Sequence, residues 1–269
     1  MRNRTLAITG ALMLAMMPAL AQQAAQSNQQ QSGSQPRPKS QKEVEALQKV
    51  QTAAQSGDPK AELQAIKDVL ENFTDTQYKP MLLSMAVDAA AHTGDLAETE
   101  VWGERALQND PNDVATRVTL AETIAQHTRE NDLDKDQSIK KASDYANKAL
   151  DLLKTANTPP PGLPAEQWPN FKQQLTSQSY DALGQGADLQ KNYPEAVKDF
   201  KAAVDAQPSN SVAMARLSKA YLDSKQYDDA ISTADKVLAM ADAPQQVKTF
   251  AQTQKDAATK LKSAPAPAK

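Results

Sequence analysis

The chain has 269 residues, no cysteine, eight glycines, 4% aromatic residues and a formal net charge of −3. Without cysteine, disulfides, thiolate nucleophiles and cysteine-ligated metal sites are excluded. The scarcity of glycine and of aromatic residues argues against an all-β sandwich or barrel. We therefore expect an all-α, alanine-rich protein.

Residues 1–21 have the three-part layout of a secretory signal peptide. Arg2 and Arg4 precede an apolar stretch over 6–17, and small residues lead up to Gln22. That stretch is shorter than the roughly 20 residues that a membrane-spanning helix needs. No cysteine follows the expected cleavage site, which excludes a lipoprotein. We expect an exported protein, periplasmic or secreted, with no transmembrane span in the mature chain.

Residues 22–40 are rich in Gln and Ser and contain no large apolar residue, which is typical of a disordered linker. The end of the chain, 263–269, alternates Ala and Pro and is typical of a disordered tail. Between them, residues 43–262 contain all 33 acids against 24 basic residues. Such an acidic body repels phosphates, so we expect no nucleic-acid partner.

The first helical block covers 41–155. We expect two helices in 41–72 around a Gly-Asp turn, and two more in 80–113 around a second Gly-Asp turn. Residues 114–153 form a further pair whose turn is enlarged around 129–136. Whether 41–72 is a true repeat of the later units is left open.

A Pro-rich connector over 156–164 separates this block from the second, 165–262. Consecutive prolines cannot continue a helix and favour an extended segment. Either the helical array continues with this segment looped out, or the array breaks into two blocks. We favour the continuous array.

The second block repeats at an offset of 34 residues. Small and large residues recur in the same order in 177–210 and 211–244. The matching pairs are Tyr180 with Met214, Leu183 with Leu217, Gly184 with Ser218, Tyr193 with Tyr227, Ala196 with Ala230, and Val204 with Leu238. Such a series identifies an internal sequence repeat of 34 residues.

This pattern resembles the tetratricopeptide repeat family. The first unit reads Tyr180-x2-Leu183-Gly184, then Ala196-x3-Phe200-x2-Ala203, then Pro208, close to the family consensus. The resemblance implies a right-handed α-solenoid of about four helix–turn–helix units plus a C-terminal capping helix. We expect that helix over 244–261, with an apolar face of Val247, Phe250, Gln254, Ala257 and Leu261.

The sequence contains no strong motif for metal binding or catalysis. The acidic turn over 131–136 begins like a calcium loop but lacks the required Gly and Glu, so we expect no calcium. His92, His127 and Asp88 could approach one another, yet a histidine at a helix C-terminus needs no metal. No nucleophile elbow, phosphate loop or dinucleotide turn is found. We expect no catalytic residue, no metal and no cofactor, and hence no enzyme.

The resemblance also implies a binding surface, because the first helix of each repeat lines a concave face. The candidate residues are Gln178, Asp181, Gln185, Asp188, Val212, Ala215, Lys219 and Leu222. They suit a polar or basic extended segment with one apolar anchor. The implied function is a non-enzymatic scaffold for an unidentified protein or peptide; the alternative is an accessory enzyme or ligand-binding factor in cell-envelope polymer handling. A second alternative is that these positions are merely solvated helix faces.

Overall fold

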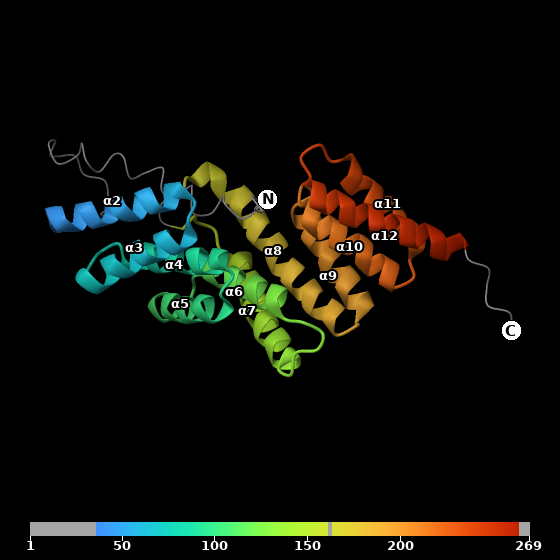
Figure 1. The fold of residues 1–269 in the computed structure, drawn as a ribbon, viewed down its shortest axis with the longest axis horizontal. Helices are drawn as coiled ribbons and strands as arrows, with labels where there is room; N and C mark the ends of the chain where they lie inside the picture. The colour runs from blue at the N-terminus through green and yellow to red at the C-terminus, as the bar shows by residue number, and fades with distance from the viewer. Residues whose placement is uncertain (1–35, 161–162, 264–269) are drawn as a thin grey trace. The chain divides into compact units, whose positions relative to one another are not determined.

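The computed structural model describes residues 36–160 and 163–263 (Figure 1). The expected signal peptide, and most of the expected linker and tail, lie outside these residues. The described part is helical with no strand, so the all-α fold class is confirmed. Its helices are α2 (Gln41–Ser56), α3 (Pro59–Asn72), α4 (Lys79–Thr93), α5 (Leu96–Asn109), α6 (Val114–His127), α7 (Lys135–Thr155), α8 (Trp168–Leu189), α9 (Tyr193–Ala206), α10 (Ser211–Asp223), α11 (Tyr227–Ala239) and α12 (Gln245–Ser263).

The chain divides into two compact units. Among the described residues, the first contains 36–120 together with 156–160 and 163–168, and the second contains 121–155 together with 169–263. The division therefore falls within α6, and not only at the Pro-rich connector where the sequence suggested a possible break. None of the helices described is long and apolar enough to cross a membrane.

In the first unit, two helix pairs share the same turn chemistry. Gly57 and Gly94 end α2 and α4 with φ values of 70° and 78°, in the left-handed region that favours glycine. Asp58 and Asp95 follow them and cap α3 and α5, accepting hydrogen bonds from backbone N–H groups of the first turn. These Gly-Asp turns, expected from the sequence, are confirmed.

The second unit carries its repeat in the backbone as well as in the sequence. Lys191 and Lys225, 34 residues apart, both adopt left-handed conformations, with φ values of 59° and 62°. The N–H groups of the next residues donate to carbonyls five positions earlier, Asn192 to Ala187 and Gln226 to Tyr221. Positive φ is uncommon for residues with a side chain, so its recurrence at this offset shows that the two helix pairs are built alike.

Small residues set the distance between the helices of each pair. A Cβ atom added at Gly184 would lie 2.7 Å from the nearest ring atoms of Phe200. At the equivalent place in the next pair, Ser218 donates its hydroxyl proton to the carbonyl of Ala230 at 2.8 Å. Ala196, Phe200 and Leu217 belong to one buried cluster that joins α8, α9 and α10. Close approach of the helices therefore depends on glycine or a small polar residue at this slot.

Helix α12 packs on α10 and α11, as a capping helix should. Its orientation differs from the sequence expectation. The side chains that it buries are Ala251 and Ala258, while Phe250 and Leu261 are 38% and 49% exposed. Alanines let the helix approach its neighbours closely, which leaves the larger apolar residues at the edge of the contact.

The segment before α2 is held against the α3–α4 connection. Glu43 is buried and accepts hydrogen bonds at 2.6 Å from the Thr76 hydroxyl and from the backbone N–H of Lys39. The Tyr78 hydroxyl donates to the Pro36 carbonyl at 2.9 Å. Residues 36–40, which the composition alone assigns to the linker, are thus fixed by hydrogen bonds.

We expect Glu43→Ala to lower the free energy of unfolding by about 2 kcal/mol, because the buried Thr76 hydroxyl loses its acceptor. The matched control is Glu45→Ala on the same helix, where the side chain is exposed and the expected change is within about 0.5 kcal/mol. Urea unfolding followed by circular dichroism measures both changes. Equal effects of the two variants would contradict the structural role given to Glu43.

Candidate functional site

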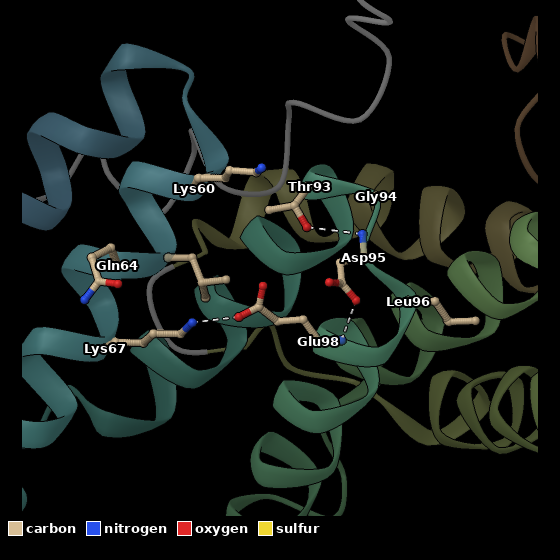
Figure 2. Close-up of a pocket in the computed structure, with 9 residues that line it drawn as sticks. Lys60, Gln64, Lys67, Thr93, Gly94, Asp95, Leu96 and Glu98 are labelled. Carbon is tan, nitrogen blue, oxygen red and sulfur yellow. Dashed lines mark hydrogen bonds and ion pairs between the residues drawn. The ribbon is translucent and has the colours of Figure 1, made fainter.

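The first unit contains a polar pocket of about 600 Å³ between α3 and the turn that connects α4 to α5 (Figure 2). Lys67 and Glu98 form an ion pair across it at 2.6 Å. Asp95 accepts the N–H of Glu98 at 3.0 Å, and the Thr93 hydroxyl oxygen accepts the N–H of Asp95 at 3.2 Å. Most of its polar groups therefore satisfy one another, which makes it a poor candidate for ligand chemistry.

The two histidines each contact their own helix. The Nδ1 atom of His92 lies 2.7 Å from the carbonyl oxygen of Asp88, and that of His127 lies 2.8 Å from the carbonyl oxygen of Thr123. Burial raises the pKa of the Asp88 carboxyl to about 6, although the Thr119 hydroxyl donates a hydrogen bond to it. These contacts place the histidines at helix C-termini, where the helix dipole favours them.

The second unit contains a groove of about 300 Å³, hereafter the groove. It is formed by the end of α6 and the turn after it, by the C-terminal part of α8, and by residues of α9, α10 and α12. Its lining residues are Ala125, Gln126, Thr128, Arg129, Glu130, Gln185, Asp188, Leu189, Phe200, Arg216, Lys219 and Phe250.

Of the eight residues expected at the binding surface, three line the groove: Gln185, Asp188 and Lys219. The remaining five, which do not line it, are Gln178, Asp181, Val212, Ala215 and Leu222. Ala215 is buried, and Val212 and Leu222 are half-buried. Gln178 donates a hydrogen bond to Glu122 at 3.1 Å. The structure thus brings together the expected residues near the C-terminal ends of the first helices.

Asp181 lies beneath the side chain of Arg216 and is only 3% exposed. It forms an ion pair with Arg216 and also accepts a hydrogen bond from Gln185 at 3.1 Å. Burial raises the pKa of the Asp181 carboxyl, an effect that Arg216 and Gln185 oppose. Asp181 therefore acts between α8 and α10, and is not exposed for a partner.

Lys219 forms a second link between the same helices. Its Nζ atom lies 3.0 Å from Asp188 on α8 and 2.6 Å from Asp223 on its own helix. Burial lowers the pKa of Lys219, but the hydrogen bonds to Asp223 and Asp188 outweigh it, and the net shift is upward. Lys219 is therefore a cation, and its single positive charge is shared between the two carboxylates.

The charges in the groove are thus mostly paired. Glu130 forms an ion pair with Lys191 at 2.6 Å. Arg129 differs: its Nη1 atom donates to the carbonyls of Gln126 and Thr128, and no carboxylate among the described residues pairs with its guanidinium. Phe250 adds an aromatic ring that is partly exposed. The groove therefore offers one guanidinium without a carboxylate, several amides and one aromatic ring.

Sequence reasoning did not assign Arg129, Arg216 and Phe250 to the binding surface. Arg129 lies in the enlarged turn, outside the repeat pattern, and Phe250 was assigned to the buried face of the capping helix. Arg216 lies on α10 directly after Ala215 and is not among the concave-face positions that the resemblance gave. These three residues lie in three separate elements, the α6–α7 turn, α10 and α12. Their spacing along the sequence therefore does not show that they meet at one surface.

Comparison with known proteins agrees with this architecture. The family model described as tetratricopeptide repeat matches residues 189–252. No curated protein sequence matches the chain significantly. Residues 189–252 are therefore similar in sequence to tetratricopeptide repeats.

Solved structures with the same fold extend the likeness beyond the matched segment. TTC0263, a thermophilic TPR protein of Thermus thermophilus, is 14% identical with a TM-score of 0.57, covering 79% of this chain and 98% of its own. A double mutant of MamA RS-1 is 14% identical with a TM-score of 0.55, covering 81% and 99%. Another MamA protein is 13% identical with a TM-score of 0.52, covering 84% and 98%. At these identities the likeness shows the fold alone, which is that of the α-solenoid class.

We expect Asp181→Ala to destabilise the second unit by about 2 kcal/mol, because Arg216 loses a buried, hydrogen-bonded partner. Asp188→Ala is the matched control on the same helix. Lys219 keeps Asp223 in that variant, so the expected loss is below about 1 kcal/mol. Thermal unfolding followed by circular dichroism measures both. A larger loss of stability for Asp188→Ala than for Asp181→Ala would contradict the claim that the Asp181–Arg216 pair stabilises the unit more than the Asp188–Lys219 pair.

Proposed function

We propose that the protein is a non-enzymatic scaffold that binds a segment of a partner polypeptide in the groove of its second unit, and that it acts after export. The observation that carries the proposal is the lining of the groove. It combines a guanidinium without a carboxylate partner, the amides of Gln126 and Gln185, and the half-exposed ring of Phe250. Polar groups that fix orientation beside one apolar anchor are typical of peptide-binding surfaces.

Support for a binding role also comes from the way the groove is built. Two of the helices that line it, α8 and α10, are cross-linked by the Asp181–Arg216 and Asp188–Lys219 pairs, so this part of the surface is held in shape before a partner arrives. A preformed surface loses less conformational entropy on binding than a flexible one. The tetratricopeptide repeat match over 189–252 includes α9, α10 and α11, which contribute to the same unit. The proposal of export rests on the layout of residues 1–21.

Site-specific photo-crosslinking in the native host tests the proposal. A photoreactive amino acid at Gln126, which is exposed and lines the groove, is expected to capture a discrete polypeptide. The matched control is the same amino acid at Gln173, an exposed glutamine on α8 that does not line the groove. Capture at Gln126 and not at Gln173 supports binding in the groove. Equal capture at both positions, or none at Gln126, would contradict it.

A further inference from the structure

Three carboxyl groups gather in the first unit where α3 packs on α4, near the start of α6. They belong to Glu62 on α3, Asp88 on α4 and Asp113 just before α6. The charge of Asp88 raises the pKa of Glu62, and that of Asp113 raises the pKa of Asp88, so neighbouring members of the cluster repel one another. Asp113 is held by Thr116, whose backbone N–H and hydroxyl donate to it at 3.0 and 2.7 Å. None of the three carboxyls forms an ion pair within the part of the chain that the structure describes.

Asp88 occupies a position at which the second unit has a lysine. It lies eight residues before the first residue of α5, and Lys219 lies eight residues before the first residue of α11. Lys219 contacts the carboxylates of Asp188 and Asp223, whereas Asp88 adds a further acid to its cluster. The first unit therefore places an acid where the second unit supplies a cation.

Two neighbours partly compensate for the missing cation. The Thr119 hydroxyl on α6 donates a hydrogen bond to Asp88 at 3.1 Å. The positive form of His92, one turn along α4, lowers the pKa of both Glu62 and Asp88. Helices α2 and α5 pack on α3 and α4 respectively, and no side chain described on them forms an ion pair with either carboxyl. Both carboxyls therefore ionise at a cost to the packed helices.

The direction of the pH dependence follows from that cost. Burial is the largest cause in both groups, and it raises the pKa of Glu62 and of Asp88 from 4.5 and 3.8 to about 6. A carboxyl whose pKa is higher in the packed state binds its proton more tightly there. Its stabilising effect is fully present below the ordinary pKa, and it is lost as the pH rises through about 6.

We propose that the contact of α3 with α4 is a proton-dependent clasp, closed when Glu62 and Asp88 carry protons and loosened when both are ionised. Loosening the clasp exposes part of the buried cluster to which Leu63 and Leu82 belong. The clasp lies in the first unit, so it goes beyond the function proposed for the groove of the second. In a protein that acts after export, it makes the stability of this unit depend on the pH of the surroundings.

Hydrogen exchange followed by mass spectrometry at pH 4 and pH 7, corrected for intrinsic exchange rates, tests the clasp on the protein as its host processes it. Glu62→Gln and Asp88→Asn replace each carboxyl by a neutral group of the same shape, and the amide oxygen at position 88 still accepts the Thr119 hydroxyl. At pH 7 each variant is expected to protect the amides of α3 and α4 about tenfold or more above wild type, since one pKa unit corresponds to a factor of ten. At pH 4 the wild type carries the protons itself, and the gain is expected to fall within about threefold.

The matched control is Glu71→Gln, an exposed glutamate on the same helix, which is expected to leave protection unchanged at both pH values. A gain of equal size at pH 4 and pH 7 would show an effect of shape or helix propensity, and would overturn the inference. Absence of a gain at pH 7, or the same gain in Glu71→Gln, would overturn it as well. Failure of the variants to fold would also contradict it, because removal of either charge is expected to stabilise the unit.

Carbon-13 NMR of the side-chain carboxyls gives a second and independent measurement on the wild type. The carboxyl carbons of Glu62 and Asp88 are expected to titrate with midpoints near pH 6. Midpoints near the ordinary values of 4.5 and 3.8 would show that packing of α3 on α4 is not linked to proton binding, and would overturn the inference.

Discussion

The close approach of paired helices is the constraint on which the rest of the second unit depends. At Gly184 there is no room for a Cβ atom beside the Phe200 ring, and at Ser218 the side chain is small enough to bond the carbonyl of Ala230. Equivalent positions 34 residues apart are therefore occupied by a glycine and by a serine, and both residues allow the two helices of the pair to approach closely. Close approach lets successive first helices lie side by side, and this brings polar groups on α8 within reach of those on α10.

The groove follows from that juxtaposition. Asp181 and Asp188 would be free acids on an isolated α8, but α10 supplies Arg216 and Lys219 to pair with them. The pairing has two consequences. It joins neighbouring repeats through partly buried charges, and it gives Asp181 and Asp188 a cationic partner each. What distinguishes this surface then comes from outside the repeat pattern, from Arg129 in the enlarged turn and Phe250 on α12. In the proposed scaffold, recognition depends on these departures from the repeat, while the repeat provides rigidity.

The features that the sequence predicts well are local or periodic. The Gly-Asp turns at 57–58 and 94–95 depend on left-handed glycine and aspartate capping, and the 34-residue offset depends on spacing alone. The rotation of α12 was predicted incorrectly because hydropathy favours burial of Phe250 and Leu261, whereas close approach selects Ala251 and Ala258. The burial of Asp181 could not be predicted either, because it depends on Arg216 from the next repeat. Contacts between repeats are non-local, so a repeat pattern does not specify them.

A double-mutant cycle on Gly184 and Phe200 tests the central constraint most directly. In the wild-type background, Gly184→Ala should lower the free energy of unfolding by about 1–3 kcal/mol, although helix propensity alone favours alanine. In a Phe200→Leu background, where the ring is absent, the same change should cost less, with a favourable coupling of about 1 kcal/mol. Additive effects, or stabilisation by Gly184→Ala in the wild type, would contradict the claim that this contact sets the spacing of the helices.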